Sequence, residues 1–346
     1  MPTMGENAGN AAREIGMKRL KLALLLGLTL LAQQAAAATK IVIGAVPNIG
    51  DGPLICAIER GYFREQDVEV DIVPFKSSSE MTPLMVRGDL TMMGGGVSVS
   101  FFNSVAQGMP LRYFVNRGQA PVWHSIVVRK GLEGKVKSAK DLKGLRIATS
   151  APGGLSEYEL GKTLETVSLS LDDIEAKHLS MPQSVAAIQS GAVDAGVFVG
   201  PFDTAAIQSG GFHLIYADEL VKPRMEVSGL IYNSTWAAKN AAALDRFTIA
   251  YIRGVRCFLD AEQPGPLREE MIDGFVKYSP IKDRAIYTDM KWTAIHPDGR
   301  VEIDSLMDMQ DFNIRRGYLT KKLPQEALFD PGPVERALRV LGPYKK

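Results

Sequence analysis

The chain of 346 residues has only two cysteines and four histidines, and it lacks the spacings through which these side chains hold metals. No Cys-x-x-Cys or His-x-x-x-His element occurs, so the sequence does not indicate a metal site. The Gly-x-Ser-x-Gly element, the Gly-x-Gly-x-x-Gly element and the P-loop are also missing. We therefore expect no cofactor and no catalytic residues, although the sequence alone leaves a hydrolytic role of Asp51 or Asp194 open.

An excess of charge of one sign is missing too. The chain carries 40 Lys and Arg against 39 Asp and Glu, so it has no basic field of the kind that binds nucleic acid. No apolar run reaches the roughly 20 residues that a membrane-spanning helix needs. Neither a nucleic acid nor the lipid bilayer is an expected partner.

What is present at the start resembles an export signal. A basic segment from Met17 precedes the apolar run Leu22–Ala32, and Ala36–Ala38 fits a small-x-small cleavage site. We predict a signal peptide over residues 1–38, with Met17 as an alternative start, and a mature chain from Thr39. Its removal leaves 36 basic and 37 acidic residues, a net charge near −1.

From residue 40 onward, apolar strands alternate with helices across short, glycine-marked joints. "KIVIGAV" (40–46) is typical of a buried strand, and "DVEVDIVPF" (67–75) alternates strictly as a strand should. The hexapeptide AAIQSG occurs at 186–191 and again at 205–210, each time ending a helix that begins near a proline. This alternation predicts α/β architecture with mostly parallel sheets flanked by helices.

The second half of the chain changes character. Residues 234–346 are mainly helical and must pack on an existing domain. The simplest topology is therefore one lobe inserted in another. Lobe I comprises 39–127 and 229–346, lobe II comprises 128–228, and a double hinge lies near 127–129 and 227–230.

The two cysteines, Cys56 and Cys257, each lie in an apolar helical context. Isolated cysteines of this kind are more often packed in the core than bonded. An exported protein can nevertheless hold a disulfide, so their pairing stays open. His124 and His213 lie in or beside apolar strands, where a core position is the simpler interpretation.

Several segments together carry a resemblance to a known family. "GYFREQDVEVDIVPF", "SSSEM", "LMVRGDLTMMGGGVS", "DLKGLRIATS" and "AAIQSGAVDAGVFVGPF" are similar to the periplasmic solute-binding proteins of nitrate-, sulfonate- and taurine-type ABC importers. Their superfamily includes binders of thiamine pyrimidine precursors. The resemblance implies two α/β lobes joined by a hinge, a ligand in the cleft between them, and partnership with a permease and an ATPase.

A run of three glycines, Gly94 to Gly96 in "MMGGGVSVS", indicates where in the chain the ligand site lies. Successive glycines mark a tight turn or a close approach to the backbone. Ligands bind at the carboxyl ends of parallel strands, where helix N-termini attract anions. Four turns with glycines or serines occupy such places: "PNIGDGP", "FKSSSEMTP", "GGGVSVS" and "TSAPGGLSEYE". We predict that a ligand oxyanion approaches the glycine run.

The predicted ligand-binding residues come from these turns, from two cations at strand ends and from nearby aromatic segments. Serines of this kind are also frequent structural N-caps, and Ser77/Glu80 and Ser156/Glu159 have the spacing of capping boxes. The predicted set is Asn48, Asp51, Lys76, Ser77, Ser78, Gly95, Gly96, Ser98, Arg117, Trp123, Ser150, Gly153, Gly154, Ser156, Phe198 and Pro201.

One departure from the family pattern limits the classes of ligand that we expect. Amine-bearing sulfonate binders carry a tryptophan and an acid where this chain has "FVGPF" (198–202). A buried ammonium would have no partner here, so taurine is disfavoured and an aromatic or extended organic anion is favoured. We expect a monomeric periplasmic protein that captures a sulfonate- or carboxylate-type anion. A pyrimidine ligand, or a role as the sensing subunit of a receptor, remains an alternative.

Overall fold

The computed structural model describes residues 38–121, 124–217 and 225–345. The predicted signal peptide lies outside the described residues except for Ala38, and Trp123 lies outside them as well. Within the described ranges, no helix has both the length and the apolar character needed to cross a membrane. The same ranges contain no group of three or more His, Cys, Asp or Glu side chains that could hold a metal ion.

Two five-stranded sheets form the framework, and they share one topology. The strand orders are β2-β1-β3-β10-β4 and β7-β6-β8-β5-β9. In each sheet four strands point the same way, while the fourth in the order, β10 or β5, runs antiparallel to both neighbours. This confirms the predicted α/β fold of two lobes. The strands of the first sheet are β1 (Thr39–Ala45), β2 (Val68–Pro74), β3 (Met92–Gly95), β4 (Leu111–Gln119) and β10 (Glu226–Asn233), and those of the second are β5 (His124–Val128), β6 (Arg146–Thr149), β7 (Glu175–His178), β8 (Ala195–Val199) and β9 (Phe212–Tyr216).

The chain crosses between the sheets earlier than the sequence predicts. β5 pairs with β8 and β9 of the second sheet, so the first crossing lies between Gln119 and His124. The second lies between Tyr216 and Glu226. The predicted hinges near 127–129 and 227–230 therefore fall within or at the end of strands, and that placement is wrong. An apolar run predicts a strand, but it does not predict which sheet the strand joins.

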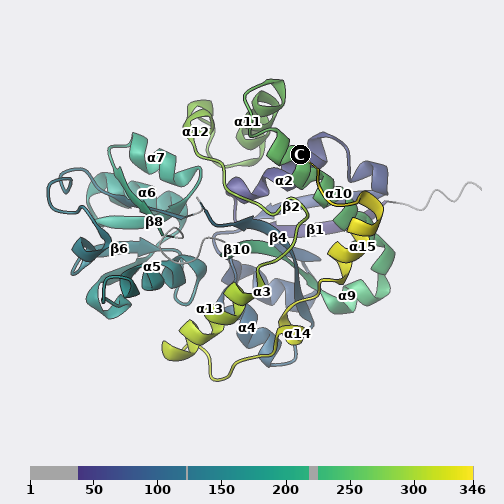
Figure 1. Ribbon diagram of the computed structural model, residues 1–346, viewed down its shortest axis with the longest axis horizontal. Helices are drawn as coiled ribbons and strands as arrows, with labels where there is room; N and C mark the ends of the chain where they lie inside the picture. The colour runs from purple at the N-terminus through teal and green to yellow at the C-terminus, as the bar shows by residue number, and fades with distance from the viewer. Residues whose placement is uncertain (1–37, 122–123, 218–224, 346) are drawn as a thin grey trace, which may run out of the picture. The chain divides into compact units, whose positions relative to one another are not determined.

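Helices cover both sheets, and the second lobe shows how local sequence sets their ends. α6 and α7 carry the two AAIQSG repeats, and they end at Gly191 and near Gly210, whose φ angles of 75° and 105° suit glycine. Figure 1 shows α5, α6 and α7 around the strands of this sheet. The helices before the second crossing are α2 (Gly52–Glu59), α3 (Ser78–Arg87), α4 (Val99–Ala106), α5 (Leu155–Glu165), α6 (Met181–Ser190) and α7 (Phe202–Gln208), with short 3-10 turns η1 (Ile49–Asp51), η2 (Arg64–Gln66), η3 (Ala139–Leu142) and η4 (Leu171–Asp173).

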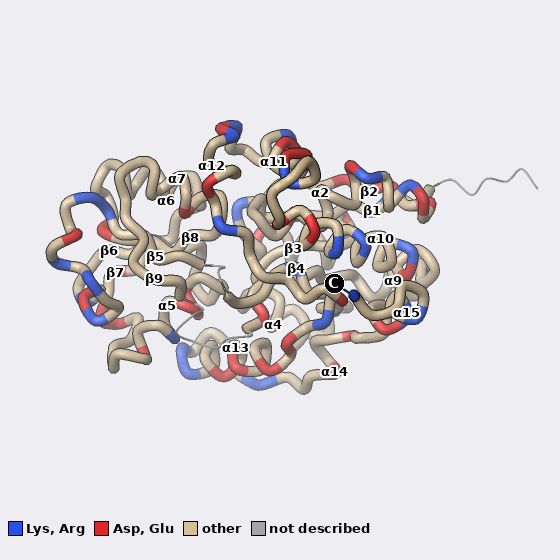
Figure 2. The backbone as a smooth tube through the Cα atoms, turned by 45° about the horizontal axis from the view of Figure 1, so that its top comes forward, with Lys and Arg blue, Asp and Glu red and all other residues tan. Residues whose placement is uncertain are grey.

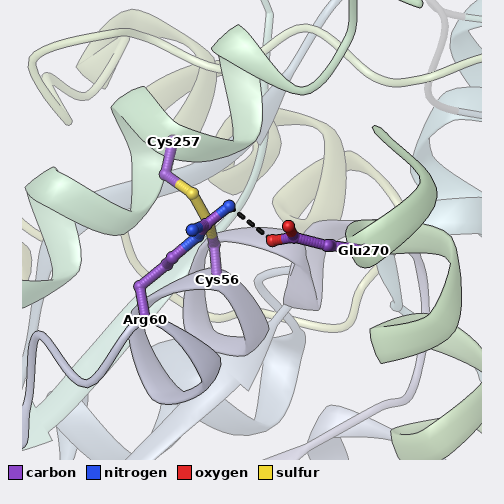
Figure 3. Close-up of a disulfide and its surroundings, with 4 residues drawn as sticks. All are labelled: Cys56, Arg60, Cys257 and Glu270. Atoms are coloured by element: carbon purple, nitrogen blue, oxygen red, sulfur yellow. Dashed lines mark hydrogen bonds and ion pairs between the residues drawn. A yellow bond between two sulfur atoms is a disulfide. The ribbon is translucent and has the colours of Figure 1, made fainter. Parts of the chain in front are cut away.

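The helical C-terminal region packs largely on the first lobe. Its longest helix, α10, lies against α2, and a disulfide joins Cys56 of α2 to Cys257 of α10 with their Cα atoms 6.3 Å apart (Figure 3). The preference for unpaired core cysteines is therefore wrong, although both side chains are buried. The helices here are α9 (Ser234–Lys239), α10 (Ala241–Asp260), α11 (Pro266–Tyr278), α12 (Arg284–Asp289), α13 (Ile303–Arg315), α14 (Gln325–Leu328) and α15 (Gly332–Leu341).

The two lobes are joined by direct contacts as well as by the crossings. Ile49 N donates to Gly200 O at 2.8 Å, and Val99 N donates to Gly153 O at 3.1 Å. α13 also contacts both β10 and α5. Along the chain, basic and acidic residues are interspersed rather than gathered by sign (Figure 2). These hydrogen bonds and the contacts of α13 bring the inner ends of the lobes together, and residues of both lobes line the cavity described next.

Candidate functional site

A small cavity of about 60 Å³ lies between the two lobes. Three helices begin at it: α3 after Ser77, α4 after Ser98 and α5 after Gly154. Each helix N-terminus offers backbone N–H groups and a partial positive charge, which together favour an anion. The residues lining the cavity, here called the serine pocket, are Val46, Asn48, Lys76, Ser77, Ser78, Ser79, Gly96, Ser98, His124, Ser150, Ala151, Gly154, Leu155, Ser156, Met181 and Val199.

Ser98 is the polar residue of the pocket that most needs a partner. It is 4% exposed, it is the N-cap of α4, and its side chain makes no capping hydrogen bond. Among the described residues its Oγ has no hydrogen-bond partner at all. A buried hydroxyl in this state costs about 1–3 kcal/mol. A ligand oxygen in the pocket would offset that cost.

The other hydroxyls are not engaged as capping boxes, contrary to the prediction. Ser77 is the N-cap of α3 but makes no side-chain cap, and Glu80 instead accepts from Lys76 N. Ser156 lies inside α5, where its Oγ accepts from Ser150 N at 3.0 Å and lies 2.9 Å from Ser150 Oγ. This local network holds two serine hydroxyls together at the pocket wall.

The glycine run lies at this site, but mostly for packing reasons. A Cβ on Gly94 would lie 2.9 Å from Leu230 Cδ2, and one on Gly95 would lie 2.6 Å from Ser78 Oγ. A Cβ on Gly96 would lie 2.8 Å from two atoms of Leu155, which belongs to the other lobe. Neighbouring side chains, rather than a ligand, therefore occupy the space beside Gly94 and Gly95. Of the three glycines, Gly96 lines the pocket.

The structure brings nine of the sixteen predicted residues to the pocket. Those nine are Asn48, Lys76, Ser77, Ser78, Gly96, Ser98, Ser150, Gly154 and Ser156. Gly95 and Gly153 lie next to lining residues in the chain without lining the pocket themselves, and Phe198 is fully buried in the second lobe. Pro201 and Asp51 line a separate small cavity.

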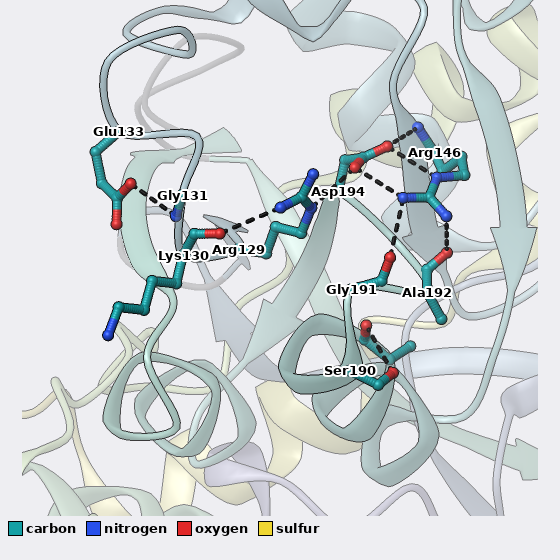
Figure 4. A network of polar contacts seen from close by, with 10 residues as sticks. Arg129, Lys130, Gly131, Glu133, Arg146, Ser190, Gly191, Ala192 and Asp194 are labelled. Carbon is teal, nitrogen blue, oxygen red and sulfur yellow. Dashed lines mark hydrogen bonds and ion pairs between the residues drawn. The ribbon is translucent and has the colours of Figure 1, made fainter.

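Arg117, expected to neutralise an anion, is occupied elsewhere. It is fully buried, donates to Asp51 Oδ1 at 2.5 Å and to Ser228 Oγ at 2.9 Å, and does not line the pocket. Asp194 is held in the same manner: Arg146 and Arg129 donate to it at 2.9–3.0 Å (Figure 4). The Arg146 guanidinium holds the pKa of Asp194 well below its usual range. Both carboxylates left open for hydrolysis are thus parts of ion pairs outside the pocket.

Sequence reasoning missed His124. The residue is buried, as predicted, but it also lines the pocket, and its Nδ1 contacts Oε2 of Glu159 on α5. The sequence spacing suggests a capping box between Glu159 and Ser156. In the structure Glu159 instead contacts His124, 35 positions away. Ser79 and Leu155 were missed as well, although each lies within one of the four turns that the sequence marks. Met181, which begins α6, lies in none of these turns.

A wider, mostly apolar groove of about 340 Å³ continues from the pocket. The two share Val46, Lys76 and Met181. Its remaining lining residues are Pro47, Pro74, Phe75, Glu80, Ser180, Pro182, Phe202 and Pro280, and it is here called the apolar groove. The site thus combines a small polar end with a larger apolar one.

Comparison with known proteins agrees with this architecture. A family model described as NMT1/THI5 like matches residues 48–263. The chain is similar to the periplasmic aliphatic sulphonate binding protein SsuA from Escherichia coli, with 20% identity, coverage of 84% of this chain and 92% of that one, and a TM-score of 0.67. It is similar to the periplasmic nitrate-binding protein NrtA from Synechocystis PCC 6803, with 14% identity, coverage of 88% and 89%, and a TM-score of 0.73. The desulfurization enzyme DSZB has 16% identity, coverage of 88% and 99%, and a TM-score of 0.65.

Proposed function

The chain belongs to the NMT1/THI5-like family, and from that premise we propose that it is the solute-binding component of an ABC importer. Its ligand is a small organic anion of the sulfonate or carboxylate type. The observation that carries the proposal is the meeting of three helix N-termini at one pocket whose serine Ser98 is buried and has no partner among the described residues.

The two parts of the site fit the two parts of such a ligand. The serine pocket, of about 60 Å³, has room for an oxyanion group and little more. The apolar groove, of about 340 Å³, has room for an aromatic or extended apolar tail. An inorganic anion such as nitrate would fill the first and leave the second to water. The pair of cavities therefore favours an organic anion over nitrate.

Binding would proceed by closure of the lobes. The ligand contacts one lobe first, and contacts from the second then favour the closed form. Closure brings groups of both lobes together at the pocket, such as the backbone of Gly96 and the side chain of Leu155. The closed, monomeric protein would deliver the ligand to a membrane permease coupled to an ATPase.

Export to the periplasm fits the disulfide. Such bonds persist in oxidising compartments and are rare in the cytosol, and the bond between Cys56 and Cys257 is buried in the first lobe. The predicted signal peptide would direct this export. A sensing subunit of a receptor would share these features, and genes for a permease and an ATPase beside this one would favour transport.

The proposal is tested by thermal unfolding of the mature chain with a panel of ligands: benzenesulfonate, ethanesulfonate, benzoate, nitrate and an aminopyrimidine. A ligand at about 100 times its dissociation constant adds roughly 2.7 kcal/mol of stability, a shift of a few degrees. We expect the largest shift from benzenesulfonate or benzoate. A shift from the aminopyrimidine alone would replace the anion by a pyrimidine. Chemical conversion of a bound ligand, detected by chromatography, would replace the binding protein by an enzyme, since the fold also occurs in DSZB.

A further inference from the structure

A buried histidine and a buried glutamate form a pair at one wall of the serine pocket. His124, the first residue of β5, is 4% exposed and lines the pocket. Its Nδ1 contacts Oε2 of Glu159, which is 0% exposed and does not line the pocket. The imidazole is therefore the member of the pair that faces the cavity, with the carboxylate behind it.

Because the pair is buried, its charge is poorly screened by water and acts strongly on neighbouring groups. A carboxylate removed from water needs a cation or strong donors beside it, and the imidazole is what the structure places there. A second carboxyl group, Asp203 on α7, is 8% exposed; burial raises its pKa, while positive charge on His124 acts to lower it. Lys76 is the other basic residue that lines the pocket, and because it is exposed its charge is screened by water. The charged groups around His124 thus include Glu159, Asp203 and Lys76.

An anion that enters the pocket changes this balance. It brings a negative charge beside an imidazole that already neighbours two carboxyl groups. Nearby negative charge favours the protonated form of an imidazole and of a carboxyl group alike. Imidazole exchanges its proton in the physiological pH range, and two groups in contact share the added proton as one coupled system.

We propose that anion binding in the serine pocket is accompanied by uptake of a proton by the His124–Glu159 pair, which thereby selects anions over neutral ligands. The proton comes from solvent, and no bond of the ligand is made or broken. The inference rests on the proposed function, since it needs an anion in this pocket. One linked proton makes the affinity fall by up to about tenfold for each unit of pH above the range in which the free pair is protonated.

The test is titration calorimetry of the purified protein with benzenesulfonate, whose sulfonate stays ionised at every working pH. Two buffers of different ionisation enthalpy are compared at each pH from about 6 to about 9. Proton uptake makes the observed binding heat differ between the buffers in proportion to the protons taken up. We expect the binding heats to differ between the two buffers within this range, together with an affinity that falls as pH rises. Equal heats in both buffers at every pH, with measurable binding, would overturn the inference and leave the proposed function standing.

Variants test whether the His124–Glu159 pair takes up the proton. His124→Gln should abolish the buffer dependence and flatten the pH profile, whereas His178→Gln, at an exposed histidine of β7, should leave both as in the unaltered protein. Persistent proton uptake in His124→Gln would refute the assignment. If that variant does not fold, Glu159→Gln is tested instead. It should move the pH dependence of the binding affinity to lower pH, because the imidazole loses its anionic neighbour. A pH dependence equal to that of the unaltered protein would count against the pair. Failure of benzenesulfonate to bind at any pH would instead count against the proposed function, and the inference would fall with it.

Discussion

Replacement of Ser98 by alanine should weaken ligand binding without destabilising the protein. The Ser98 hydroxyl is buried and has no hydrogen-bond partner among the described residues. In the free protein its removal should leave stability unchanged or raise it by about 1 kcal/mol, because an unsatisfied group is lost. For a chain of this size that is an increase in melting temperature of about 1–2 °C.

In the proposed complex the same hydroxyl would donate to the ligand's oxyanion. A hydrogen bond to a charged group contributes about 1.5–3 kcal/mol, so Ser98→Ala should raise the dissociation constant roughly 10- to 150-fold. Titration calorimetry with benzenesulfonate and thermal unfolding of the free protein measure the two effects separately. The reverse pattern is expected of Ser305→Ala, since Ser305 is equally buried but accepts a hydrogen bond from Glu226 N at 3.0 Å, outside the pocket.

That control should lose about 1–3 kcal/mol of stability, because a buried N–H loses its partner, and should keep its affinity. A role of Ser98 in binding would be excluded if Ser98→Ala bound the anion as tightly as the unaltered protein. It would equally be refuted if Ser98→Ala lost stability as Ser305→Ala does, since Ser98 would then be a structural cap.

Three further predictions concern closure, the disulfide and pH. Gly96→Ala should place a methyl group 2.8 Å from Leu155 of the other lobe and weaken ligand binding by about 1–3 kcal/mol. The control Gly134→Ala, whose methyl group meets nothing within 4 Å, should bind the ligand as the unaltered protein does. Equal affinities of the two variants by calorimetry would show that the lobes do not close at Gly96. Reduction of the disulfide between α2 and α10 should lower the free energy of unfolding by about 2–4 kcal/mol in urea titrations; unchanged stability would contradict this. It should leave ligand affinity intact, because neither cysteine lines the pocket. Burial raises the pKa of Glu226 from 4.5 to about 8, so between those values the unfolded chain releases a proton that the folded protein keeps, and stability falls as pH rises. Glu226→Gln should therefore gain stability relative to the unaltered protein as pH rises through this window, by a few kcal/mol at most; parallel pH profiles in urea unfolding would exclude a raised pKa.

The strands, the repeated helix ends and the fold class were predictable because they depend on local pattern. Alternating or continuous apolar runs specify strands, and the last residue of each AAIQSG repeat, a glycine with a positive φ, stops the helix before it. Sheet membership is not local. His124–Val128 is buried throughout and would suit either sheet, so its pairing with β8 and β9 had to come from the tertiary structure.

The polar half of the site was predictable for the same reason, and its pairings were not. Serines and glycines at strand ends mark the turns that form the pocket. The partner of each side chain, however, comes from a distant segment: Glu159 meets His124, and Cys56 meets Cys257 across 201 residues. Capping-box spacing is a weak guide where a helix N-terminus faces a cavity, because the hydroxyl there can serve a ligand instead of the helix.

A crystal structure of the protein with benzenesulfonate tests the proposed binding site most directly. We expect sulfonate oxygens in the serine pocket, within about 2.7–3.0 Å of Ser98 Oγ, and the phenyl ring in the apolar groove beside Phe75 and Met181. A benzenesulfonate bound elsewhere, or a sulfonate in the groove with Ser98 still unpartnered, would contradict it.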